Sequence, residues 1–170
     1  MCSSDLCMVG LATVGTNFIT DWLMEGIQEL DTIELVAVYS RTMEKGKEFA
    51  AKYGVTKVYD NYDAMAEDPE IDAVYVASPT ALHFTHTMCM LNHGKHVLCE
   101  KPVASNGKEL ELMIQAAKDN QVVFMEAMKS VHTPGFKAMM DNLDKIAPVR
   151  RVTLQYCQYS SRYDKFKKVN

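Results

Sequence analysis

Short apolar segments with the composition of strands alternate with longer amphipathic segments along almost the whole chain. The expected strands are 8–14, 33–39, 57–59, 73–77, 96–99, 122–125 and 149–159, and the expected helices are 17–30, 43–53, 61–66, 82–93, 106–119 and 134–143. The first helix is expected to bury one face, formed by Phe18, Ile19, Trp22, Leu23 and Ile27. Strands this apolar are buried on both faces, which requires helices on both sides of a parallel sheet. The alternation therefore predicts a doubly wound α/β fold.

Composition narrows the range of functions. The 170 residues carry a net charge of −4 with a pI near 5.7, which is not the electrostatic pattern of a protein that binds nucleic acid or an anionic membrane. No apolar run is long enough to span a bilayer. The five cysteines are scattered without a CxxC pair, so we expect a reduced, cytoplasmic protein with neither a disulfide framework nor a zinc site. Its partner is expected to be a small molecule.

The two ends of the chain carry separate expectations. Segment 2–6 matches one translated frame of a common sequencing adapter, and 1–6 lacks the basic and apolar regions of a signal peptide, so we expect 1–6 to be an assembly artefact. The last expected strand is longer than the others and partly alternating, which favours the start of a second, α+β unit. The expected domains are the α/β domain at 7–148 and a truncated sheet domain at 149–170.

The turn after the first strand, in TVGTNFIT (13–20), is the first candidate ligand site. Open parallel sheets bind ligands at the carboxyl ends of their strands, where the strand order reverses. Of the three glycines in the dinucleotide-binding pattern, this turn keeps Gly15 and has Asn17 and Thr20 at the other positions. Gly15 permits a tight turn, and the helix N-terminus at Asn17 offers N–H groups and a side-chain donor to a pyrophosphate. The alternative is an ordinary strand–turn–helix with an incidental glycine.

The end of the second strand bears on which dinucleotide binds. An NAD site normally carries an acid there for the ribose 2′-hydroxyl, whereas an NADP site lacks the acid and supplies a cation. Here the strand ends in Tyr39-Ser40-Arg41-Thr42, without a carboxylate. Ser40 and the guanidinium of Arg41 suit a 2′-phosphate, so NADP is the expected cofactor and NAD the alternative. Equally, Ser40 or Thr42 could cap the next helix and be accompanied by a solvated arginine.

The segment GKHVLCEKPVAS (94–105) leads from a buried strand directly into Glu100, Lys101 and Pro102. The proline restrains the backbone next to the lysine, at the edge of the sheet where ligands bind. Either Lys101 is held in place for chemistry or it is a solvated loop lysine, and the segment alone leaves both alternatives open.

Together, five segments resemble the Gfo/Idh/MocA family of NAD(P)-dependent oxidoreductases. They are TVGTNFIT (13–20), VAVYSRTMEKGKEFAAKYG (36–54), IDAVYVASPTALH (71–83), HGKHVLCEKPVAS (93–105) and FMEAM (124–128). The GKHVLCEKP run is the most specific of them. The resemblance extends over 11–159 and implies a Rossmann domain. In family members a larger sheet domain follows, and this chain is expected to hold only its start.

The resemblance implies roles for individual residues. Lys101 would face the reacting carbon, hydrogen-bond the substrate oxygen and stabilise negative charge as it develops. Pro102 would fix its backbone, and Glu100 would orient the cofactor or the lysine. The implied cofactor contacts are Gly15, Thr16, Asn17, Phe18, Ile19, Ser40, Arg41, Ser78, Pro79, Thr80, His83, Glu100, Lys101 and Glu126. His83 and His86 stand one helical turn apart, but without an acid or thiol at ligand spacing we expect no metal.

The expected function is that of an NADP-dependent oxidoreductase that transfers a hydride between nicotinamide and a secondary alcohol or carbonyl carbon of a sugar, cyclitol or related polyol. Two rivals share the fold: a non-catalytic NADP-binding sensor and an NAD-dependent glycoside hydrolase. The acid and base groups that family members carry in the second domain have no counterpart before Asn170, so we expect this fragment alone to be inactive and to self-associate. The full protein is expected to form a homo-oligomer through its second domain.

Overall fold

The computed structural model describes residues 8–146, 148–157, 159–160 and 163–167. These belong to two compact units, residues 1–128 and residues 129–170. The expected artefact at 1–6 lies outside the described residues, and the expected domain boundary between 148 and 149 stays a prediction. In the described part of the chain, no helix is both long and apolar enough to cross a membrane.

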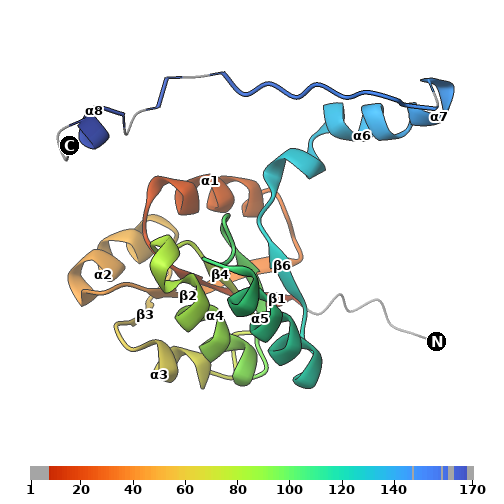
Figure 1. The fold of residues 1–170 in the computed structure, drawn as a ribbon. Helices are drawn as coiled ribbons and strands as arrows, with labels where there is room; N and C mark the ends of the chain where they lie inside the picture. Colours follow the sequence, from red (N-terminus) through yellow and green to blue (C-terminus); the bar gives the residue numbers. More distant parts are fainter. Residues whose placement is uncertain (1–7, 147, 158, 161–162, 168–170) are drawn as a thin grey trace. The chain divides into compact units, whose positions relative to one another are not determined.

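The first unit is built on a six-stranded sheet in which all neighbouring strands are parallel (Figure 1). The strands lie in the order β3-β2-β1-β4-β5-β6. Their bounds are β1 Val9–Val14, β2 Ile33–Tyr39, β3 Lys57–Tyr59, β4 Ala73–Val76, β5 His96–Cys99 and β6 Phe124–Glu126. The order reverses between β1 and β4, which makes this the topological switch point. The doubly wound α/β fold expected from the sequence is confirmed.

Helices cover both faces of the sheet and form two apolar clusters with it. Alternation along β1 places Leu11 in one cluster and Ala12 and Val14 in the other. The helices of the first cluster are α1 Phe18–Ile27 and α2 Met43–Lys52; those of the second are α3 Tyr62–Ala66, α4 His83–Asn92 and α5 Gly107–Asp119, with the short helix η1 Thr80–Leu82 leading into α4. Because both faces are covered, a ligand reaches the sheet at the carboxyl ends of its strands.

The expected buried face of α1 is present in part: Ile27 is buried and Ile19 and Leu23 pack against the same apolar cluster, but Phe18 and Trp22 do not belong to it. Thr20, Met24 and Ile27 are buried, whereas Phe18 and Trp22 are 62% and 59% exposed. Thr20 faces the sheet because its hydroxyl donates to the backbone of the preceding turn at 3.1 Å. With this position turned inward, the residues at i+4 and i+7 follow it. Phe18 and Trp22 instead pack edge to face with each other, with ring centroids 5.2 Å apart.

The second unit differs most from the sequence-based expectation. Its described residues form the short helices η2 Lys129–His132, α6 Pro134–Met140, α7 Leu143–Ile146 and α8 Tyr163–Lys167, so the helix expected at 134–143 is interrupted after Met140. The strand expected at 149–159 is wrong, because residues 149–157 and 159 have no regular secondary structure. A strand needs a hydrogen-bonded neighbour, and the six-stranded sheet includes none of these residues. Leu154 and Tyr156 are accordingly 89% and 85% exposed.

Candidate functional site

The carboxyl ends of β1, β2 and β4 surround a cavity of about 440 Å³. It lies at the switch point, where an open parallel sheet binds ligands. The turns after these three strands form its walls. The lining residues are Val14, Gly15, Thr16, Asn17, Tyr39, Ser40, Arg41, Thr42, Lys45, Ala77, Ser78, Pro79, Leu82 and His86. They include two cations, Arg41 and Lys45, and no carboxylate.

Gly15 closes the first turn in a backbone conformation that favours glycine. Its φ is +116°, and a Cβ atom there would lie 2.7 Å from the carbonyl oxygen of Ala77. Any side chain at this position would force the turns after β1 and β4 apart. The N–H of Gly15 also donates to the carbonyl oxygen of Tyr39 at 3.3 Å, which joins the turn to the end of β2. The tight turn expected at Gly15 is present.

Side chains occupy the positions of the two absent glycines. The Asn17 side-chain oxygen caps α1 by accepting from the Ile19 N–H at 2.9 Å, and its amide donates to the Ala77 carbonyl oxygen at 2.8 Å. Thr20, which is fully buried, donates to the Gly15 carbonyl oxygen. These contacts fix the first turn against β4. They also engage the Ile19 N–H, one of the groups expected to meet a pyrophosphate.

The turn after β2 forms a cationic corner of the cavity. Ser40 is buried, whereas Arg41 and Lys45 are exposed and line the cavity. Thr42 occupies the N-cap position of α2, as the alternative interpretation expected, but its side chain makes no capping hydrogen bond. Lys45 follows Thr42 by three residues, which places both on one side of the helix. Sequence reasoning missed Lys45, although this spacing could have indicated it.

His86, on α4, lines the cavity beside the turn after β4. Its Nδ1 lies 2.9 Å from the hydroxyl oxygen of Ser78, and its ring packs against Tyr39 and Tyr62 with centroid distances of 5.8 and 5.1 Å. Burial, and to a smaller extent the neighbouring His83, hold the pKa of His86 below its ordinary value. At pH 7 the ring is therefore neutral and presents an uncharged aromatic surface to the cavity.

His83, the first residue of α4, joins two turns. It is 1% exposed and is not among the residues that line the cavity. Its Nε2 lies 2.8 Å from the carbonyl oxygen of Ser78, and its Nδ1 lies 2.9 Å from that of Pro102. A ring nitrogen that carries a proton donates to the carbonyl oxygen beside it. The ring thereby links the turn after β4 to the turn after β5.

The turn after β5, residues 100–103, carries the lysine. One carboxylate oxygen of Glu100 accepts from the hydroxyl of Tyr75 at 2.7 Å, and the other accepts from the backbone N–H of Lys101 at 3.2 Å. The Lys101–Pro102 peptide bond is cis. The side chain of Lys101 is exposed, and with the residues that the structure describes its ammonium forms no hydrogen bond or ion pair.

Glu126, the last residue of β6, supports the same turn because its Oε1 accepts from the N–H of Val103 at 3.0 Å. The structure thus gathers Glu100, Lys101 and Glu126 at the carboxyl ends of β5 and β6.

Of the other expected site residues, those that line the cavity are Gly15, Thr16, Asn17, Ser40, Arg41, Ser78 and Pro79. Those not among its lining residues are Phe18, Ile19, Thr80 and His83. Sequence reasoning missed contributions from Thr42, Lys45, Tyr75 and His86.

Comparison with known families shows which family this chain belongs to. The family described as oxidoreductases with an NAD-binding Rossmann fold, GFO_IDH_MocA, matches residues 5–128. The chain belongs to the Gfo/Idh/MocA family. The matched residues include all six strands, the cavity and the lysine turn.

Three relatives illustrate the similarity. The chain is 52% identical over 160 residues to scyllo-inositol 2-dehydrogenase (NADP(+)) IolU of Bacillus subtilis, covering 94% of this chain and 49% of the relative. It is 43% identical over 159 residues to the oxidoreductase YgjR of Escherichia coli, with coverages of 94% and 48%. The crystal structure of KijD10, a 3-ketoreductase from Actinomadura kijaniata in complex with NADP and TDP-benzene, matches with a TM-score of 0.75 at 28% identity, over 81% of this chain and 42% of that one. The chain spans about half the length of the two curated relatives.

Proposed function

We propose that the protein to which this chain belongs is an NADP-dependent oxidoreductase. It moves a hydride between nicotinamide and a secondary alcohol or carbonyl carbon of a cyclitol, sugar or related polyol. The observation that carries the cofactor choice is the corner after β2, where Ser40, Arg41 and Lys45 line the cavity and no lining residue is a carboxylate. Two relatives support the reaction class: one is named for scyllo-inositol and NADP(+), and the other is a 3-ketoreductase in complex with NADP.

The proposed nucleotide contacts are residues that line the cavity. The turn after β1 would hold the pyrophosphate, because Gly15 leaves room there for a close approach of the backbone. Arg41 and Lys45 would hold the 2′-phosphate, because their charges complement it. Pro79 and the neutral ring of His86 supply uncharged surface on the side of β4.

The lysine turn supplies the proton chemistry. When bound, the nicotinamide supplies or accepts the hydride. In the direction of carbonyl reduction, Lys101 hydrogen-bonds the carbonyl oxygen and stabilises the negative charge that develops there. It then transfers a proton to this oxygen, which leaves a secondary alcohol and a neutral lysine amine. Glu100 and Glu126 hold the backbone of the turn through the N–H groups of Lys101 and Val103.

The two rival functions have less support. A non-catalytic nucleotide sensor would have no use for an exposed lysine that is held beside the strand ends and lacks an ion-pair partner among the described residues. An NAD-dependent glycoside hydrolase would have no use for two cations at the 2′-phosphate corner. Assembly into a homo-oligomer stays a prediction.

Calorimetric titration of the 170-residue chain with NADPH and NADH tests the cofactor, and we expect NADPH to bind more tightly. Equal or reversed affinities would remove the NADP assignment. Turnover of the full protein with NADP⁺ and scyllo-inositol, followed by absorbance of the reduced nicotinamide, tests the reaction. Failure to oxidise scyllo-inositol and a panel of other cyclitols and sugars would remove the substrate class.

A further inference from the structure

Tyr75 stands in the middle of the sheet and yet reaches the lysine turn. β4 pairs with β5 so that Tyr75 lies beside Leu98, and Glu100 follows Leu98 by two residues on the same face. The ring of Tyr75 is 2% exposed and packs in the apolar cluster of α1 and α2. Its hydroxyl, at the end of the ring, donates a hydrogen bond to Oε1 of Glu100 at 2.7 Å. A core side chain thus makes a polar contact at the edge of the site.

The hydroxyl of Tyr75 is a permanent donor. Burial, then the hydrogen bond to Glu100 and the charge of that carboxylate, hold the pKa of Tyr75 far above its ordinary value. Tyr75 therefore stays protonated throughout the pH range in which a protein of this kind is assayed. The carboxylate of Glu100 consequently always has this partner available.

Glu100 precedes Lys101 in the sequence, but its carboxylate forms hydrogen bonds with other groups than the Lys101 ammonium. Oε1 accepts from Tyr75, and Oε2 accepts from the backbone N–H, not the ammonium, of Lys101. The ion pairs that the described residues form involve Lys52 and Lys57, and Lys101 takes part in none of them. If Oε1 lost its donor, it would be left partly buried and unsatisfied, and the ammonium of Lys101 would be the cation nearest in sequence.

From these contacts we propose that Tyr75 is a positioning residue for Lys101. By holding the carboxylate of Glu100 against the sheet, its hydroxyl keeps the ammonium of Lys101 unpaired and available to a substrate oxygen. The consequence for turnover rests on the function proposed above, whereas the consequence for the state of the lysine does not. The competing explanation is that Tyr75 contributes to stability alone.

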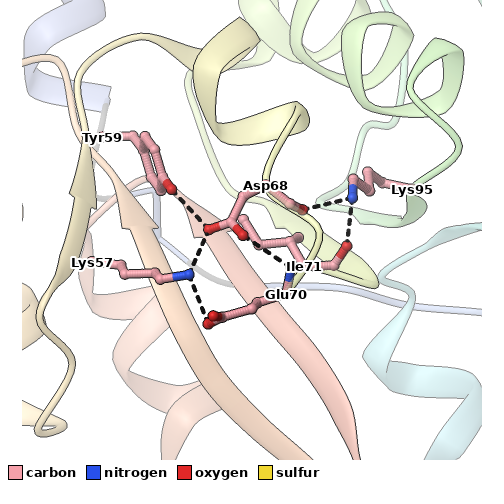
Figure 2. Close-up of polar contacts among 6 residues, drawn as sticks. All are labelled: Lys57, Tyr59, Asp68, Glu70, Ile71 and Lys95. Atoms are coloured by element: carbon pink, nitrogen blue, oxygen red, sulfur yellow. Dashed lines mark hydrogen bonds and ion pairs between the residues drawn. The ribbon is translucent and has the colours of Figure 1, made fainter.

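Tyr59 provides a matched control for that explanation. It too is a strand tyrosine whose hydroxyl donates to a carboxylate, Oδ2 of Asp68, at 2.8 Å (Figure 2). Asp68 also accepts from Lys57 and from the N–H of Glu70, each at 2.9 Å. Neither Tyr59 nor Asp68 lines the cavity or belongs to the lysine turn. Tyr59→Phe therefore removes the same kind of hydrogen bond without changing the contacts among Tyr75, Glu100 and Lys101.

The decisive measurement is the reactivity of Lys101 in the 170-residue chain. Trace acetylation with acetic anhydride, followed by mass spectrometry, reports how fast this amine reacts. We expect Tyr75→Phe to slow the labelling of Lys101 about threefold, the size of effect expected of a new exposed ion pair with Glu100. Tyr59→Phe should leave it unchanged. An unchanged rate in Tyr75→Phe, or equal slowing in both variants, would overturn the proposal.

A double variant guards against a general loss of structure. Glu100→Gln removes the charge that would pair with the lysine, so Tyr75→Phe/Glu100→Gln should label Lys101 at the rate of Glu100→Gln alone. If Tyr75→Phe slows labelling as strongly in the Glu100→Gln background, the effect does not pass through Glu100 and the proposal is wrong.

Turnover of the full protein gives a second, separable readout. Tyr75→Phe should lower kcat by on the order of tenfold, through misplacement of the lysine, and leave the KM for NADP⁺ unchanged. A parallel rise in that KM would contradict a positioning role, since Tyr75 does not line the nucleotide cavity. If the unmodified protein turns over no polyol, the proposed function fails, while the labelling rates still decide the role of Tyr75.

Discussion

Removal of the two cations at the end of β2 should change the choice between NADPH and NADH. Arg41→Ala and Lys45→Ala each delete a positive charge from the cavity lining. A charge-assisted hydrogen bond to phosphate contributes about 1.5–3 kcal/mol when shielded from water. Both side chains are exposed, so we take about 1 kcal/mol for each. This corresponds to a roughly fivefold loss of NADPH affinity per substitution and, if the two act independently, about 25-fold for the double variant.

NADH and a neighbouring lysine provide the controls. NADH has no 2′-phosphate, so its affinity should not change in any of the three variants. Lys47→Ala removes an exposed charge from the same helix at a position that does not line the cavity, and should alter neither affinity. Raising the ionic strength from about 0.1 M to about 1 M shortens the Debye length from roughly 10 Å to roughly 3 Å. The preference of the unmodified chain for NADPH should fall accordingly, and that of the double variant should fall much less.

Calorimetric titration of the 170-residue chain with each cofactor measures these changes. Equal losses of NADPH and NADH affinity would place Arg41 and Lys45 on a part of the nucleotide that both cofactors share. If Lys47→Ala lost as much NADPH affinity as Lys45→Ala, the effect would depend on the net charge of the protein and not on a position in the cavity. Either result would refute the assignment of this corner to the 2′-phosphate.

Three further predictions address catalysis, the glycine turn and acid stability. Lys101→Ala should lower turnover of the full protein by about two orders of magnitude with NADPH affinity unchanged, and near-native steady-state kinetics would exclude the proton-transfer role. Gly15→Ala should lower the free energy of unfolding by roughly 1–3 kcal/mol in urea titrations, whereas Gly26→Ala, with open space around its Cβ, should not lower it. Burial alone would raise the pKa of Asp68, but the hydrogen bonds in Figure 2 outweigh burial and leave it below its ordinary value. The contribution of Asp68 to the free energy of unfolding is therefore complete above about pH 4 and is lost as pH falls through the lowered pKa. Asp68→Asn should make the free energy of unfolding fall less steeply at acidic pH, and equal slopes against pH in the two proteins would contradict this.

The sheet could be predicted because its strands are almost uniformly apolar and are separated by recognisable helix signals, such as the capping residues Asn17 and Asn106. The buried face of α1 could be predicted only in part, because two overlapping apolar stripes satisfy the helical period. One runs through Phe18 and Trp22, the other through Met24 and Ile27, and the hydrogen bond of an intervening threonine decides between them.

The strand expected at 149–159 failed for a different reason. Alternating Val, Leu and Tyr residues favour an extended chain locally, but β-propensity expresses packing against neighbouring strands. Among the described residues no neighbouring strand pairs with this segment. Local pattern therefore carries less information here than it does for the helices, whose hydrogen bonds are internal.

Some residues of the site could be predicted from a short segment of sequence, and others depend on which elements lie side by side. Gly15 and the acid-free end of β2 were found because each signal lies within a few consecutive residues. Lys45 looks like any surface lysine of a helix, and Tyr75 looks like any core residue of a strand. Their contributions depend on which elements adjoin, namely α2 beside the cavity and β4 beside β5. Such information is absent from any single segment.

Three protein side chains hold the lysine turn in place. Tyr75 on β4, His83 on α4 and Glu126 on β6 each form one polar contact with residues 100–103. All of these groups belong to one compact unit and are at least partly buried, so their positions are set by the packing of the sheet. Donors and charges that are oriented before a substrate arrives need no reorganisation when charge develops in the reaction. The exposed ammonium of Lys101 therefore projects from a turn whose backbone the fold has already fixed.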